Sequence, residues 1–239
     1  MKSWLPHAGA IALLPFALPG ASLAAADRPP LYAGLQAELL LENSRVIVEK
    51  FVLAPGQSTG RHTHPGDHLL VFVRGGTLRS LTTGRSTLWR DGRVLWQSSS
   101  DAPEEGSRNI GSTPVVMIWV TLKPIGAASA SAGHQAHYLD YPNIPGEDLL
   151  ENERVIVQRF TVNPGQWEGV HAHGPNMLYI HIKGGQWAAR SRKEPEHPYP
   201  EASPDGEVGW MPPIDISEGH ESGNIGKRPI DLIWVTLKD

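Results

Sequence analysis

Residues 40–48 read LLENSRVIV, and the same stretch returns at residues 149–157 as LLENERVIV. Each copy continues into Pro-Gly-Gln, a His-x-His pair and a Gly-Gly, so that residues 40–76 and 149–185 agree at 18 of 37 positions without a gap. Near their ends the copies share Asn-Ile-Gly (109–111 and 224–226) and Trp-Val-Thr-Leu-Lys (119–123 and 234–238). A repeat of about 110 residues is too long for a solenoid or propeller unit, and it therefore predicts a duplicated domain.

The segments outside the repeat indicate export and a flexible connection. Residues 1–26 start with a single lysine, carry a short apolar run and end in small residues, as a signal peptide does; a disordered Ala/Pro-rich leader is the alternative. Residues 126–136 are rich in Ala, Ser and Gly, as flexible linkers are. We therefore expect an N-terminal domain at residues 27–125 and a C-terminal domain at residues 137–239, located in a bacterial periplasm or outside the cell.

Composition excludes several classes of function. The net charge of −4 offers no basic surface for nucleic acid, and the apolar run of the leader is too short to span a membrane. Cysteine is absent, so disulfides, thiolate metal ligands and a cysteine nucleophile are excluded. The partner that remains is a small molecule, bound by a monomer or a homodimer.

The apolar pattern predicts an all-β protein. Runs of strand length, rich in β-branched and aromatic residues, lie between Gly, Pro and Asn turns at residues 46–52, 69–73, 115–122, 178–182 and 232–237. The only helix that we expect is a short one near residues 35–41. The second copy carries six extra residues, which fall in the polar, proline-rich segment 191–206. That segment is either a surface insertion or a lid.

Paired histidines point to metal. Residues i and i+2 of a strand face the same side, so His62 and His64 aim together, as do His171 and His173. Two imidazoles held on one rigid strand provide half of a metal site.

The spacing around these pairs resembles the first motif of the cupin family, G-x5-H-x-H-x3-E-x6-G, in both copies. The second cupin motif ends in a histidine four residues before an asparagine, and His220 and Asn224 fit it. The chain is thus similar to a bicupin over nearly the whole length that follows the leader. This resemblance implies two tandem RmlC-like jelly-roll barrels, each with a metal site.

Two positions depart from the cupin pattern. The glutamate of the first motif is replaced by His68 in the first copy and by Met177 in the second, and the last histidine corresponds to Glu105 and to His220. Glu104 is the alternative to Glu105, because a shift of one residue in the loop would exchange them. The resemblance then implies a first ligand set of His62, His64, His68 and Glu105.

In the second copy the resemblance implies a set of three imidazoles, His171, His173 and His220, with Met177 lining the pocket. Neutral imidazoles bind divalent transition metals. We expect iron or manganese, with nickel, copper or zinc as alternatives. The first hypothesis is an exported metalloenzyme that acts on a small oxygen-rich molecule as a dioxygenase, decarboxylase, lyase or isomerase. The alternatives are a non-catalytic binding module with one or both sites degenerate, and a structural pair of barrels.

Overall fold

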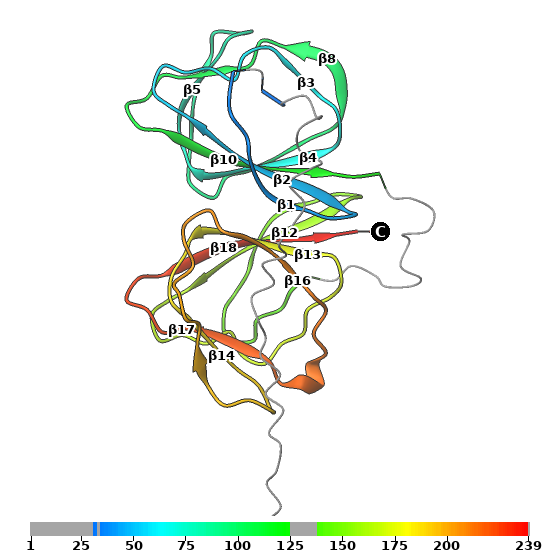
Figure 1. The fold of residues 1–239 in the computed structure, drawn as a ribbon, viewed down its shortest axis with the longest axis vertical. Helices are drawn as coiled ribbons and strands as arrows, with labels where there is room; N and C mark the ends of the chain where they lie inside the picture. The colour runs from blue at the N-terminus through cyan, green and yellow to red at the C-terminus, as the bar shows by residue number, and fades with distance from the viewer. Residues whose placement is uncertain (1–30, 33, 125–137, 239) are drawn as a thin grey trace, which may run out of the picture.

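The computed structural model describes residues 31–32, 34–124 and 138–238, and these residues form an almost pure β structure (Figure 1). The strands of the first repeat are β1 (Glu38–Glu42), β2 (Val46–Leu53), β3 (His62–His64), β4 (His68–Arg74), β5 (Gly76–Ser80), β6 (Ser86–Trp89), β7 (Val94–Gln97), β8 (Ser100–Glu104), β9 (Ser107–Asn109) and β10 (Val115–Leu122). Those of the second repeat are β11 (Glu147–Glu151), β12 (Val155–Val162), β13 (Met177–Lys183), β14 (Trp187–Arg190), β15 (His197–Pro198), β16 (Val208–Met211), β17 (Glu221–Asn224) and β18 (Ile230–Leu237). A single 3₁₀ turn, η1 (Ile216–Glu218), precedes β17.

The all-β prediction is confirmed, and only the short helix expected near residues 35–41 is wrong. Strand β1 lies there instead and pairs antiparallel with β2, because Leu40 and Leu41 gain a partner in the apolar core that an isolated helical turn would not reach. The leader and the linker lie outside the described residues. In the described part of the chain, none of the helical structure has the length and apolarity that a membrane crossing requires.

The two repeats fold alike. The first builds a five-stranded sheet in the order β1-β2-β10-β4-β7, and the second builds one in the corresponding order β11-β12-β18-β13-β16. Smaller sheets, β3-β8 and β6-β5-β9 in the first repeat and β15-β14-β17 in the second, face them. The result is two tandem jelly-roll barrels, as the sequence predicted.

The central strands are buried on both faces, which explains why their sequences are unbroken apolar runs. All eight residues of β18 are buried. Along that strand Leu232 and Trp234 face the interior of the second barrel, whereas Ile233 and Val235 face the other repeat. A central strand such as β18 therefore contributes side chains to two cores, the interior of its own barrel and the core between the barrels.

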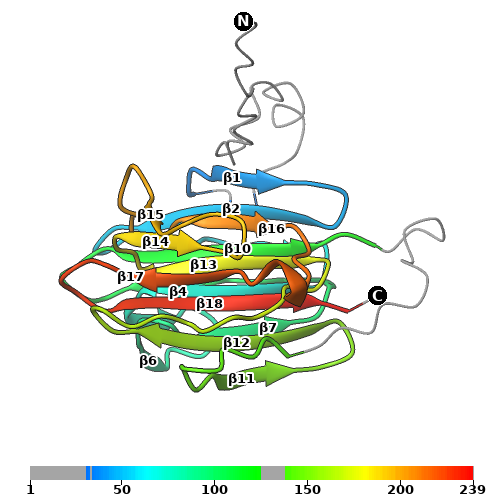
Figure 2. The same cartoon turned by 90° about the horizontal axis from the view of Figure 1, so that it is seen from below.

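The shared core lies between the barrels. The two five-stranded sheets pack face to face (Figures 1 and 2), and their outward side chains form one cluster that includes Val71 and Val120 from the first repeat and Ile180 and Val235 from the second. Separate apolar clusters occupy each barrel interior. Each Å² of apolar surface buried between the barrels contributes about 25 cal/mol, so this contact is a major source of stability.

Equivalent arginines join the barrels at equivalent points. Arg45 Nη2 donates to the carbonyl of Lys238 at 3.1 Å, and Arg154 Nη2 donates to the carbonyl of Lys123 at 3.3 Å. Arg154 also pairs with Asp67 at 3.0 Å. Because both arginines and both lysines correspond in the repeat, the barrels are related by an approximate two-fold axis.

The Pro-Gly-Gln motif in each repeat is a tight turn after the second strand. The amide of Gln57 donates to the carbonyl of Ala54 at 3.0 Å, with Gly56 at φ +78°, and its counterpart Gly165 has φ +77°. A proline followed by a residue with positive φ is the signature of a type II turn, and glycine is the residue that adopts it without strain. This turn directs the chain toward the histidine pair.

Candidate metal centres

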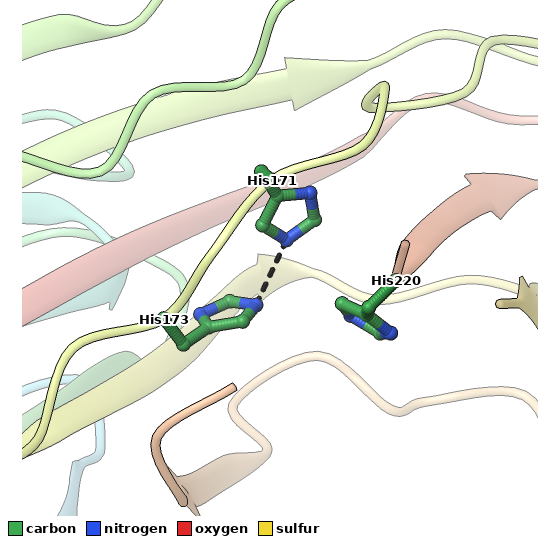
Figure 3. Close-up of side chains that lie close together, drawn as sticks. All are labelled: His171, His173 and His220. Carbon is green, nitrogen blue, oxygen red and sulfur yellow. Dashed lines mark hydrogen bonds between the residues drawn. The ribbon is translucent and has the colours of Figure 1, made fainter. Parts of the chain in front are cut away.

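Three imidazoles converge in the second barrel (Figure 3). His171 and His173 come from the connection between β12 and β13, and His220 directly precedes β17. The Nε2 atoms of His171 and His173 lie 2.8 Å apart, and the three side chains offer nitrogen atoms that all lie within 4.8 Å of one another. The structure thus brings together the three histidines that the sequence placed in one site.

The backbone fixes this arrangement without a regular strand at the histidine pair. His173 exchanges two backbone hydrogen bonds of 3.0 Å with Ile214, and the amide of His171 donates to the carbonyl of His220 at 3.2 Å. Ala172 is exposed between the two buried histidines, so the alternation predicted for a strand is kept. The turn that carries the third histidine is therefore tied to the other two.

The three imidazoles are held in the form that binds metal. His171 Nδ1 lies 2.8 Å from the carbonyl of Gly169 and donates to it, which leaves the lone pair on Nε2. Burial lowers the pKa of His173 to about 2, with the other two imidazoles adding to the effect. Burial likewise lowers the pKa of His220 to about 4. Neutral nitrogen donors that face one another fit a divalent transition metal.

A buried carboxyl group that the sequence did not single out lies beside this centre. Glu168 is only 3% exposed, and its Oε2 is 3.9 Å from His171 Nε2 and accepts from the amide of Ser222 at 3.2 Å. Burial raises the pKa of Glu168 to about 8, although hydrogen bonds from Tyr141 and Ser222 oppose the rise. The corresponding residue of the first repeat is Thr59, and this exchange of threonine for glutamate was the signal that could have revealed it.

Glu168 makes a testable contribution to the pH dependence of stability. Its pKa is raised in the folded protein, so the folded state binds more protons than the unfolded state, and stability falls as pH rises from about 4.5 to about 8. We expect Glu168→Gln to increase the free energy of unfolding of the metal-free protein at pH 8 by a few kcal/mol, and by much less at pH 5. Urea unfolding at the two pH values measures the difference. An equal change at both would contradict the assigned ionisation.

A cavity of about 90 Å³ opens beside the three histidines. Its wall includes His173, His220 and Glu168, and it continues along Tyr179 and Trp187. The proline-rich segment 191–206 contributes two further residues, Tyr199 and Ser203. That segment therefore forms part of the cavity wall in addition to the surface.

The first barrel carries a smaller group of candidate ligands. Oε1 of Glu104 lies 3.0 Å from His62 Nε2 and 3.5 Å from His64 Nε2. The carboxylate predicted first, Glu105, is not in this group; its side chain is 59% exposed and lies 3.8 Å from the guanidinium of Arg61. The reason is the pairing of β3 with β8, in which His62 is opposite Glu104.

His68, the fourth residue of the predicted first set, also lies outside this group of ligand atoms. Its Nδ1 is 2.7 Å from the carbonyl of Gly66, and its ring stacks on Trp119 with 3.9 Å between centroids. Burial lowers the pKa of His68 to about 4. Its buried Nε2 has no hydrogen-bond partner, so it remains a lone-pair donor adjacent to His64.

One further observation supports a metal ion at the first group of donor atoms. The buried Nε2 of His62 makes no hydrogen bond although the carboxylate of Glu104 is 3.0 Å away. The two atoms approach each other as ligands of a common centre do. A His₂-carboxylate set is a common one for divalent transition metals.

Glutamate substitutions distinguish the two neighbouring carboxylates. We expect Glu104→Gln to weaken metal binding in the first barrel about tenfold or more, and Glu105→Gln to leave it unchanged. The measurement is Co²⁺ titration by calorimetry in a His171→Ala/His173→Ala background, which isolates the first barrel. Equal losses in the two variants would remove Glu104 from the ligand set.

Comparison with known proteins supports the fold. No family model and no curated protein matches the sequence. Among solved structures, the chain is similar to AerE from Microcystis aeruginosa (12% identity, 88% of this chain and 96% of that one, TM-score 0.54). It is also similar to a salicylate 1,2-dioxygenase from Pseudaminobacter salicylatoxidans (11% identity, 86% and 77%, TM-score 0.53). A putative glyoxylate induced protein from Pseudomonas aeruginosa matches at 12% identity over 88% of this chain and 83% of that one, with a TM-score of 0.58.

Proposed function

We propose that this chain, which has the cupin fold in two tandem copies, is a metal-dependent enzyme. Its reaction takes place in the second barrel. The observation that carries this proposal is the convergence of three neutral imidazoles, those of the buried His171 and His173 and the partly buried His220, with the last two lining a cavity. Three protein ligands leave coordination positions free for a substrate, as catalytic sites require. The similar salicylate 1,2-dioxygenase supports an enzymatic role for this fold.

The bound ion is iron or manganese in this proposal, with nickel, copper or zinc as alternatives. When bound, it supplies Lewis acidity to an oxygen-rich substrate, or electrons if it is redox-active. The side chains and backbone around the ion orient its ligands and contact the substrate. The Gly169 carbonyl orients the ring of His171, and Glu168 stands where it can hydrogen-bond a molecule placed between the imidazoles and the cavity. In the metal-free protein burial raises the pKa of Glu168 to about 8, so its carboxyl group can donate a hydrogen bond there as well as accept one.

The first barrel has a different role in this proposal. Its centre combines His62 and His64 with a carboxylate, Glu104, that is 46% exposed, and Phe51 and Trp119 belong to the apolar cluster inside that barrel. A metal there would lie next to a solvent-exposed carboxylate. We assign it a binding or structural role, which is the second function that the sequence allowed.

Export completes the proposal. The leader at residues 1–26 would direct the protein to a bacterial periplasm or out of the cell, where it acts on a small molecule as a monomer or a homodimer. Absence of cysteine suits an oxidising compartment, since no thiol is exposed to oxidation.

The decisive experiment is metal analysis of protein purified from the periplasm, followed by reconstitution with Co²⁺ as a spectroscopic probe. We expect at least one metal per chain, that of the second barrel, to resist dialysis, with a visible spectrum that changes when small oxygen-rich compounds are added. A chain that retains no metal, or one whose Co²⁺ spectrum responds to none of them, would exclude an enzyme of this kind.

A further inference from the structure

The interior of the second barrel differs from that of the first at corresponding positions of the repeat. Tyr179 and His181 on β13 correspond to Leu70 and Phe72 on β4. In the first barrel Phe72 is part of the apolar interior, with Leu70 packed against it. Because apolar residues satisfy the same fold, the hydroxyl group of Tyr179 is not needed to build a barrel. The ring of His181 is held in the wall by Trp187, whose Nε1 donates to its Nε2 at 3.3 Å, and by Glu207. Both Tyr179 and His181 line the cavity.

A continuous series of rings runs from the candidate metal centre along the wall of the cavity to His181. The ring centroids of His173 and Trp234 are 5.1 Å apart, those of Trp234 and Tyr179 are 5.5 Å apart, and those of Tyr179 and His181 are 5.2 Å apart. This wall is suited to the flat face of a ring. The cavity volume of about 90 Å³ is of the same order as the ~150 Å³ that holds a benzene molecule elsewhere, so the cavity is suited to a single ring whose substituents reach toward its mouth.

The charges around the cavity disfavour an anion. Among the described residues that line it there is neither lysine nor arginine. A carboxylate, Glu207, lies behind His181, with its Oε2 3.1 Å from His181 Nδ1. A buried carboxylate or phosphate of a ligand would lose its water without gaining a cation beyond the metal. The hydroxyl groups of Tyr199 and Ser222, in contrast, line the cavity and can hydrogen-bond to the hydroxyl groups of a ligand.

We propose that the second barrel selects a small, planar, hydroxylated molecule that carries no carboxylate or phosphate. One of its oxygens is directed toward His171, His173 and His220, and its ring lies against Trp234 and Tyr179. This inference rests on the metal centre proposed above and adds the class of substrate that the cavity accepts.

The test compares two probes of similar size and shape, 4-methylcatechol and 3,4-dihydroxybenzoate, which differ in a methyl group against a carboxylate. Protein loaded with redox-inert Zn²⁺ is titrated with each probe by calorimetry at pH 7 without oxygen. We expect 4-methylcatechol to bind about tenfold or more tightly than 3,4-dihydroxybenzoate. Metal content is measured before and after each titration.

The Glu207→Gln variant identifies the source of the discrimination. We expect it to strengthen binding of 3,4-dihydroxybenzoate about threefold or more and to leave 4-methylcatechol unchanged. Glu201→Gln, an exposed position in the neighbouring loop, is the control and should change neither. Equal or tighter binding of the carboxylate by the natural sequence, or no binding of 4-methylcatechol to Zn²⁺-loaded protein, would overturn the inference. Failure to retain Zn²⁺ would instead overturn the metal centre on which it rests.

Discussion

Replacing His171 and His173 together by alanine is expected to remove the metal from the second barrel and to leave the barrel folded. The two imidazoles supply two of the three candidate ligands, and His220 alone cannot hold a divalent ion against dialysis. We expect the affinity of this centre to fall by about a thousandfold or more, on the scale of the free energy that imidazole ligands contribute to zinc sites. Plasma mass spectrometry after dialysis measures the metal content, and circular dichroism measures the fold.

The fold is expected to persist because neither histidine is part of the apolar clusters that hold the barrel together. The buried Nδ1 of His173 has no hydrogen-bond partner, so removing that ring also removes an unsatisfied polar atom. His197→Ala, a histidine on β15 outside both centres, is the matched control and should retain all metal. Unchanged metal content in the double variant would show that the ion is bound elsewhere.

The fold was predictable because the same pattern of turns, histidines and apolar runs occurs twice in the sequence. The repeated histidine pair and the type II turn before it identify the architecture, and the apolar runs at residues 115–122 and 232–237 coincide with β10 (Val115–Leu122) and with most of β18. A run buried on both faces does not say what each face meets. The apolar run alone therefore does not indicate that neighbouring residues such as Ile233 and Trp234 belong to two different cores.

The site was predictable only where ligands are fixed by local spacing. His171 and His173 are two residues apart, and their convergence follows from that spacing. The choice between Glu104 and Glu105 depends on how β8 pairs with β3, and a shift of one residue reverses the face of a strand. Glu168 was missed because its exchange with Thr59 is one of many differences between the two repeats and does not by itself show that the glutamate is buried. Its environment arises from Tyr141 and from β17, which are distant along the chain.

The largest effect on folding is expected at Ile180, whose side chain is fully buried in the core between the barrels. Ile180→Asp would place a carboxylate in a cluster whose described members are all apolar, at a cost of about 5 kcal/mol or more. Because the core is shared, both barrels are expected to lose their native signals together. Circular dichroism and the yield of soluble protein measure this outcome.

A graded series makes the shared core measurable in folded protein. We expect Ile180→Val to lower the free energy of unfolding by about 1 kcal/mol and Ile180→Ala by about 3 kcal/mol. Ile225→Val, at an exposed position of the second repeat, should leave it unchanged. Calorimetry of the metal-free variants should give one transition that moves as a whole; separate transitions, with only one of them displaced, would contradict a common core. Tyr179 and His181 flank Ile180 on the same strand and face the cavity, so the packing that joins the two barrels also holds the wall of the candidate active site in place.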